Sequence, residues 1–172
     1  SAGAAYVVDV CLPMIAALRR LEAQSLSAQF VLGLSPELLG FLAAPPCVEA
    51  VGCLLRDRIE QAEAGVQRAE EHSERAELAR LDRAGVLALQ TLFEQLHGDL
   101  LSEYVRLSEA SRIELATTIA TQGPLTDLMS SAEAIRFQIM TAAQTFEHHL
   151  GHKSQGLILD GQVICRPLIP SL

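Results

Sequence analysis

Tryptophan is absent from the 172 residues of this sequence, and aromatic residues of all kinds make up only 4% of them. A hydrophobic core must therefore be built mostly from Leu, Ile, Val and Ala. Sugar-binding proteins normally stack sugar rings on aromatic side chains, so this shortage counts against an extensive sugar site. Proline and glycine are also few, at 7 and 11 residues, whereas 49% of the chain is apolar. This composition is typical of one globular domain, which we expect to span residues 1–172.

Basic residues are too few and too dispersed for a nucleic-acid surface. The 13 Lys and Arg are outnumbered by 21 Asp and Glu, which gives a net charge of −8. Nucleic acid carries a dense negative charge and would be repelled by the chain as a whole. Between Arg56 and Arg83 the arginines alternate with Glu and Asp, a pattern typical of a solvated helix face. We therefore expect no nucleic-acid partner.

The cysteines are not spaced as a disulfide framework or as a zinc site. No C-x-x-C pair occurs, and each cysteine has apolar neighbours. We therefore expect buried, reduced thiols in a cytoplasmic protein. The cysteines are Cys11, Cys47, Cys53 and Cys165.

The apolar stretch near the N-terminus, residues 4–21, contains Asp9, Pro13 and two arginines. These residues predict that it does not cross a membrane, and it lacks the basic-then-apolar order of a targeting signal. Its apolar residues recur every three or four positions, which predicts a helix over residues 5–24. Pro13 is expected to kink that helix.

Three short runs predict strands between these helical segments, because they are apolar or rich in β-branched residues. They are residues 29–34, 112–120 and 156–159. The other predicted helices are a short one from Ser35 to about Leu42, three pieces over residues 48–110, and one over residues 130–150. Alternating helices and strands imply parallel pairing with right-handed crossovers. The predicted fold is a helix-rich α/β fold with about three parallel strands.

Several residues mark where the helices should begin and end. Ser35 followed by Pro36 is a favourable helix start. Ser130, with Glu133 three residues later, predicts a capping box, and Gly151 predicts a left-handed stop. The positions where the segment 48–110 is expected to bend or break are Gly65, Gly85 and Gly98.

Chemistry in α/β sheets and barrels gathers beyond the carboxyl ends of the strands. That rule selects Ser35, Gln122 and the segment from Asp160 to Gln162. A retaining glycosidase needs two carboxylates about 5–5.5 Å apart. Asp160 is the only carboxylate at the three ends, whereas Glu114 lies early in its strand, near the opposite end. One carboxylate cannot be both nucleophile and acid/base, so the residues alone give little support for a catalytic site.

The histidines His148, His149 and His152 invite a comparison with metal sites. His148 and His152 have the i,i+4 spacing of helical zinc ligands, but Gly151 is expected to end the helix between them. No H-E-x-x-H motif occurs. We interpret all three as solvated histidines near a helix C-terminus, where positive charge is favourable. The sequence therefore predicts no metal site.

Three segments together resemble one enzyme family. The segment from Tyr6, YVVDVCLPMIAALRRLEAQSLSAQFVLGLSPELL, is similar to a helix followed by "F.LTLSLSP.LL". The run RIELATTIATQGPL, which begins at Arg112, resembles "RLELITCAATHGFLP". Residues 133–159 resemble "EAVRAQI..AV..H...FG..P.GIWLPE". These patterns, in this order, are those of family 57 glycoside hydrolases of the α-glucan branching type.

The resemblance implies an incomplete (β/α)7 barrel and α-glucan as a partner. The family makes α-1,6 branches in α-1,4-glucans by a retaining, covalent mechanism that uses no metal or organic cofactor. Its nucleophile is the Glu of "WLPECGY", and the aligned residue here is Gly161. Asp160 becomes a catalytic candidate only if a gap shifts it into that slot. The substrate-binding candidates are Ser35, Gln122, which stands where the group has His, and Gln162.

Two interpretations of function follow. In the first, the chain is a fragment or degenerate homologue of a branching enzyme and is inactive as it stands. The family's histidine motif would then fall before Ser1, and its Asp acid/base beyond Leu172. In the second, the chain is a non-catalytic α/β protein used for binding or assembly. Because three strands leave two open edges where a barrel leaves none, we also expect the chain to self-associate or to be marginally stable.

Overall fold

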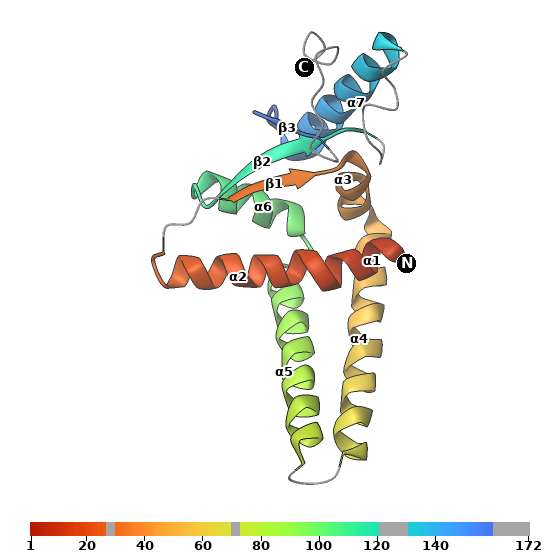
Figure 1. Cartoon of the computed structure of the whole chain (residues 1–172), viewed down its shortest axis with the longest axis vertical. Coiled ribbons are helices and arrows are strands. Elements are labelled where there is room, and N and C mark those ends of the chain that lie inside the picture. The colour runs from red at the N-terminus through yellow and green to blue at the C-terminus, as the bar shows by residue number, and fades with distance from the viewer. Residues whose placement is uncertain (27–29, 70–72, 121–130, 160–172) are drawn as a thin grey trace. The chain divides into compact units, whose positions relative to one another are not determined.

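The computed structural model describes residues 1–26, 30–69, 73–120 and 131–159 (Figure 1). They form two compact units. Residues 1–26 and 45–100 belong to the first unit, and residues 27–44 and 101–172 to the second. The expectation of a single domain stays a prediction.

The first unit begins with one continuous helix in three parts, α1 (Ala2–Tyr6), η1 (Val7–Cys11) and α2 (Leu12–Ala23). The helix predicted over residues 5–24 is thus confirmed. The irregularity expected at Pro13 takes the form of the π-helical part η1, in which the Leu12 N–H donates to the Val7 carbonyl. Pro13 has no N–H to donate, so the regular α-helical ladder cannot continue through it.

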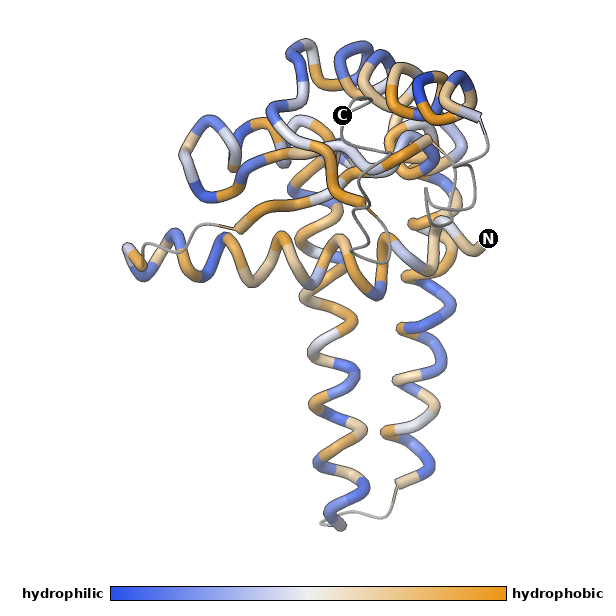
Figure 2. The backbone as a smooth tube through the Cα atoms, turned by 45° about the horizontal axis from the view of Figure 1, so that its top comes forward, coloured by the Kyte–Doolittle hydropathy of each residue, from blue (hydrophilic) through white to orange (hydrophobic). Residues whose placement is uncertain are grey.

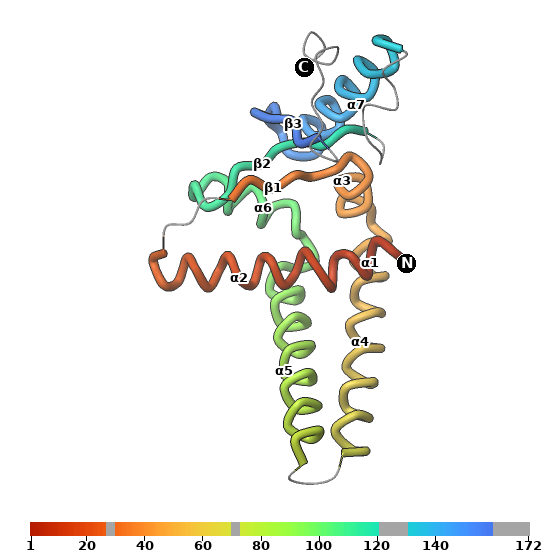
Figure 3. Tube along the Cα trace, in the orientation of Figure 1, coloured from red at the N-terminus to blue at the C-terminus, as the bar shows by residue number. Residues whose placement is uncertain are grey.

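Two long helices complete the first unit, α4 (Pro45–Arg68) and α5 (Glu74–Gln95). They lie side by side as a hairpin, and the N-terminal helix crosses both of them (Figures 1 and 3). Figure 2 shows apolar and polar residues alternating along the hairpin, as expected of helices with one buried face. Their buried residues are Cys47, Val51, Leu55, Ala62, Ala76, Leu92 and Phe93.

The N-terminal helix also meets, by length and a mean hydropathy of 1.5, the requirements for crossing a membrane. A buried core helix of a soluble protein can meet the same requirements. Its buried residues, among them Val8, Leu12 and Ile15, face the interior of the first unit, where the helix contacts α4 and α5. That it does not cross a membrane stays a prediction.

The glycine predictions for residues 48–110 were wrong at two of three positions. Gly65 and Gly85 lie inside α4 and α5, and a Cβ on either would meet nothing within 4 Å. A glycine weakens a helix by about 1 kcal/mol but does not end one that neighbouring helices support. Gly98 does follow a helix end, and its φ of 74° requires glycine-like freedom.

The cysteine prediction was also wrong at one position. Cys11 and Cys47 are buried as expected, whereas Cys53 is exposed, and none of the three forms a disulfide. Cys53 lies two residues from both Val51 and Leu55, which are buried, so the helical period turns it to the opposite face of α4. Cys165 lies outside the described residues.

The second unit contains a parallel sheet in the order β1 (Phe30–Leu34), β2 (Ile113–Thr118) and β3 (Leu157–Ile158). Phe30 pairs with Ile113, and Thr118 pairs with Ile158. The predicted strands and their parallel pairing are therefore confirmed, with every strand end within two residues of its predicted position. The helix-rich α/β class is confirmed as well.

Three helices accompany this sheet: α3 (Pro36–Ala43), α6 (Leu100–Glu109) and α7 (Ala132–Leu150). The last of these packs on α3 and on β2. The buried residues of α7 are Ile135, Ala142, Phe146 and Leu150, and Gly151 ends the helix as predicted, with a φ of 76°. The predicted capping box was wrong, because the cap is Ser131, whose hydroxyl accepts from the Ala134 N–H at 3.1 Å. The residue three positions after Ser131 is Ala134 and not Glu133, so no carboxylate is placed to complete a capping box.

Candidate functional site

The three strands end at one edge of the sheet, as the sequence predicted for the site. Leu34 pairs with Thr117, Thr117 pairs with Leu157, and one residue later Thr118 pairs with Ile158. The carboxyl ends of parallel strands therefore meet there, and α3 follows β1 at that end (Figure 1).

Ser35 lies at this edge, directly after β1. Its hydroxyl accepts a hydrogen bond from the Leu38 N–H at 3.1 Å and so caps α3. The cap explains the residue without a ligand, and a role in substrate binding stays a prediction.

The other predicted site residues, Gln122, Asp160 and Gln162, lie outside the described residues, as does Gly161. The structure does describe where the chain leaves the sheet toward them. Ile119 and Leu159, the residues just beyond β2 and β3, belong to one apolar cluster with Ile135, Ile139 and Leu157. The residues that directly follow β2 and β3 are therefore packed in the same apolar cluster.

The described part of this edge is apolar and tightly packed. A Cβ on Gly33 would lie 2.8 Å from Ile158 Cδ1 and 3.2 Å from Thr118 Cγ2. The Thr117 hydroxyl donates to the Thr118 carbonyl, and the Thr118 hydroxyl donates to the Ile119 carbonyl. Gly33 was missed by sequence reasoning, because nothing in the sequence pairs it with a residue 125 positions away.

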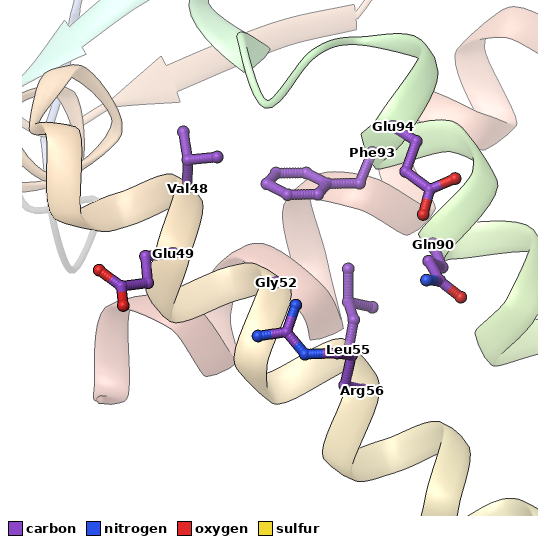
Figure 4. Close-up of a pocket in the computed structure, with 8 residues that line it drawn as sticks. All are labelled: Val48, Glu49, Gly52, Leu55, Arg56, Gln90, Phe93 and Glu94. Atoms are coloured by element: carbon purple, nitrogen blue, oxygen red, sulfur yellow. The ribbon is translucent and has the colours of Figure 1, made fainter.

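A pocket of about 330 Å³ lies between α4 and α5 in the first unit (Figure 4). Its lining combines apolar and polar residues, and the ring of Phe93 points from α5 toward Val48 on α4. Glu94 lies on α5 and Glu49 on α4, and their carboxylates point in different directions. The pocket is lined by Val48, Glu49, Gly52, Leu55, Arg56, Gln90, Phe93 and Glu94.

That pocket has no arrangement suited to glycosidic chemistry. Two carboxylates would have to converge on one bond, and the side chains of Glu49 and Glu94 do not converge. The Arg56 guanidinium donates instead to Cys53 Sγ at 3.1 Å, on the outer face of α4.

A larger groove, of about 550 Å³, lies at the opposite edge of the sheet, where β1 and β2 begin. Glu114 lines it, as expected from its place early in β2, together with an exposed aromatic ring and several polar side chains. The lining residues are Phe30, Val31, Ser108, Ser111, Ile113, Glu114, Leu115, His152 and Gln155.

The histidines do not form a metal site within the described part of the chain. There, no group of three or more His, Cys, Asp or Glu residues is placed to hold a metal ion. His148 and His149 lie in the last turn of α7 with ring centroids 4.9 Å apart. His152 is exposed and packs edge-on against Phe146, at a centroid distance of 5.6 Å.

Electrostatic coupling is clearest in the first unit. The Arg58 guanidinium donates to both carboxylate oxygens of Asp9, with Nη2 3.0 Å from Oδ2. This hydrogen bonding holds the pKa of Asp9 below its usual range and raises the pKa of Arg58. Burial, with a smaller contribution from Cys11, raises the pKa of the Cys47 thiol. These groups join η1 to α4 and form no catalytic set.

Comparison with known proteins gives a family for this arrangement. Residues 52–171 match the family model described as "Glycosyl hydrolase family 57". A stretch of 67 residues is 34% identical to the 1,4-alpha-glucan branching enzyme TK1436 of Thermococcus kodakarensis. That match covers 39% of this chain and 10% of the branching enzyme.

Solved structures show the same fold at lower identity. TK1436 in complex with glucose aligns with a TM-score of 0.81 at 19% identity, over 90% of this chain and 28% of that one. A GH57-type branching enzyme from Pyrococcus horikoshii gives 0.78 at 19% identity, over 85% and 27%. The alpha-amylase AmyC from Thermotoga maritima gives 0.71 at 20% identity, over 81% and 27%. The chain thus has the fold of somewhat more than a quarter of each enzyme.

Proposed function

The chain belongs to glycosyl hydrolase family 57, and from that premise we propose that it binds α-glucan without cleaving or branching it. It spans about a tenth of the curated branching enzyme and just over a quarter of the solved chains. The activity of those larger enzymes is therefore not transferred as a whole. What is proposed is a part or degenerate copy of a branching-type enzyme, inactive as it stands.

The observation that carries this proposal is the sequence after β3. In the family pattern that strand leads into the nucleophilic glutamate, whereas here it leads into Asp160 and Gly161. A retaining enzyme must form a covalent glycosyl ester with a side-chain carboxylate. Glycine has no side chain, so the aligned position cannot form that ester. Asp160 is the one neighbouring carboxylate that could replace it.

The test is incubation with amylose, followed by debranching and analysis of chain lengths. A family branching enzyme serves as the positive control. We expect the chain-length distribution to stay unchanged with this chain, while retarded migration in an amylose-containing gel reports binding. Branches formed by the wild-type chain and lost in Asp160→Asn would overturn the inactivity. Unretarded migration would overturn α-glucan binding.

A second function, assembly, is favoured by the outer strand β1. Within the described residues β1 pairs only with β2, and Phe30 and Val31 on it are exposed. An unpaired strand edge with apolar side chains is a template for pairing with another chain. Sedimentation of the wild-type chain tests this second proposal, which a monomer at all concentrations contradicts.

A further inference from the structure

We propose that the groove where β1 and β2 begin is a binding site for a neutral oligosaccharide, remote from the edge where the family's chemistry would lie. Strand β2 runs from Ile113 to Thr118, so the two edges are separated by five residue steps of the strand. At about 3.3 Å per step this is roughly 16 Å. Only the choice of α-glucan as the sugar rests on the proposed function. We call this site the amino-edge groove.

The size of the amino-edge groove suits a few sugar units. Its volume of about 550 Å³ lies within the range typical of small-molecule sites. Three segments distant in sequence form it: the start of β1, the turn from α6 into β2, and the loop from α7 into β3. The figures show β1 and β2 starting together at the end away from α3 (Figure 1).

An exposed aromatic ring borders the groove. The side chain of Phe30 is 49% exposed and that of Val31 is 60% exposed, although both belong to a strand. A sugar ring has an apolar face of C–H groups that packs on an aromatic ring of this kind. The chain has few aromatic residues, and Phe30 places one of them, exposed, at the border of a polar groove.

The groove also offers hydrogen-bonding groups of both kinds. Glu114 pairs in register with Val31, so the two side chains leave the sheet on the same face. Gln155 approaches from the loop before β3. Neither Glu114 nor Gln155 makes a side-chain hydrogen bond or ion pair with the described residues. Ser108, Ser111 and His152 add further donors and acceptors, which together match the hydroxyl groups of a sugar.

The backbone around these groups is fixed in advance. The Ser154 hydroxyl accepts from the Thr117 N–H at 3.0 Å and donates to the Gly156 carbonyl at 2.6 Å, which ties the Gln155 loop to β2. On the opposite side the Ser111 N–H donates to the Ser108 carbonyl at 2.9 Å. Preformed walls reduce the entropy that is lost when a ligand binds.

Charge selects a neutral ligand over the alternatives. Phosphate and other anions would meet Glu114 and a chain of net charge −8. A bound calcium ion would need six or more oxygen ligands, whereas apolar side chains form much of this wall. An oligosaccharide is neutral, and its apolar ring faces and hydroxyl groups suit the exposed aromatic ring and the polar side chains of this groove.

The test is titration of the whole chain with maltoheptaose, followed by ¹⁵N-resolved NMR and by calorimetry. We expect amide shifts at Val31, Ser111, Glu114 and Gln155. Shifts centred on Ser35 and Thr118 instead would overturn the proposal, because they would place the sugar at the opposite edge. An absence of binding at millimolar maltoheptaose would also overturn it.

Variants supply the second readout. Phe30→Ala should weaken binding about tenfold or more, as truncation of a central contact does. Phe137→Ala is the matched control, since Phe137 on α7 is also exposed and does not line the groove. Gln155→Ala, in an exposed loop, should weaken binding without lowering the melting temperature. Equal affinities in all three variants would contradict the site.

The outcome is distinct from that of the amylose assay. Cleavage or branching of amylose in that assay would refute the proposed inactivity but would not contradict binding at the amino-edge groove. Retardation in the amylose gel without amide shifts at the groove would leave α-glucan binding standing and refute this site.

Discussion

Ile158 on β3 reaches across β2 to Gly33 on β1, so that a Cβ on Gly33 would lie only 2.8 Å from Ile158 Cδ1. Thr118 on β2 lies between them, with its methyl group 3.2 Å from the same position. The three strands therefore close on one another at their carboxyl ends through a contact that requires the absence of a side chain.

Enlarging Gly33 should destabilise the second unit. We expect Gly33→Val to lower the free energy of unfolding by about 1–3 kcal/mol, because the added methyl groups overlap Ile158 and Thr118. Urea unfolding followed by circular dichroism measures this change. In an Ile158→Ala background the same substitution should cost less, and equal costs in the two backgrounds would show that the contact does not exist.

Two glycines of the first unit, Gly85 and Gly98, should respond in opposite directions to alanine. Gly85→Ala should stabilise by up to about 1 kcal/mol, because Gly85 is helical and has open space around it. Gly98→Ala should destabilise by about 1–2 kcal/mol, because its φ is 74° and a Cβ would lie 2.9 Å from both Val48 methyl groups. Melting temperatures of the two variants, measured side by side, check the signs. Stabilisation by both would rule out the described turn.

The ion pair between Asp9 and Arg58 should make stability depend on pH at the acidic end. The pKa of Asp9 is lower in the folded chain than in the unfolded chain. Its contribution is therefore fully present above the unfolded pKa of about 3.9 and is lost as pH falls through the folded value. Since the Asp9 side chain is 50% exposed, solvent screening limits the contribution to about 0.2–1 kcal/mol.

Asp9→Asn tests this pH dependence. The variant should be slightly less stable than the wild type at neutral pH and equal to it at a pH below the folded pKa of Asp9. Thermal unfolding across that range measures the difference. A difference that persists unchanged at low pH would mean that the charge of Asp9 is not its cause.

Glu103 should be the most consequential carboxylate on α6. Its side chain is buried, and it accepts from Arg106 Nε at 2.9 Å and from Nη2 at 3.0 Å. Glu103→Ala should cost about 1–3 kcal/mol, because a charge-assisted hydrogen-bonded pair is broken in a buried position. Glu109→Ala, on the exposed end of the same helix, should stay within about 0.5 kcal/mol of wild type. Similar losses in both variants would indicate a general effect on helix α6.

Local sequence signals predicted much of the fold. Ser35 and Gly151 mark helix ends through groups within three or four residues of themselves, and both were confirmed. Strand positions followed from runs of apolar and β-branched residues, and parallel pairing followed from the helices between them. In each case the physical cause is contained in a short window of sequence.

Features set by tertiary contacts were beyond that reasoning. Gly65 and Gly85 resemble helix breakers, but the pairing of α4 with α5 supports the helices through them. The exposure of Cys53 has a local cause instead, the helical period of α4, which a reading of its apolar neighbours alone did not take into account. The amino-edge groove joins Phe30, Glu114 and Gln155 from three separate segments, and no spacing rule could have joined them. The predicted residues Gln122, Asp160 and Gln162 stay predictions.

We propose that the segment after β3, which supplies the nucleophile in the family, supplies none in this chain. The most direct measurement is the intact mass of the wild-type chain after incubation with a fluorinated α-glucosyl fluoride, a reagent that traps the glycosyl ester of retaining enzymes. A family branching enzyme, treated in parallel, should gain the mass of one trapped sugar. We predict an unchanged mass for this chain, because Gly161 offers no carboxylate. A gain of one sugar that maps to Asp160 and disappears in Asp160→Asn would contradict the claim.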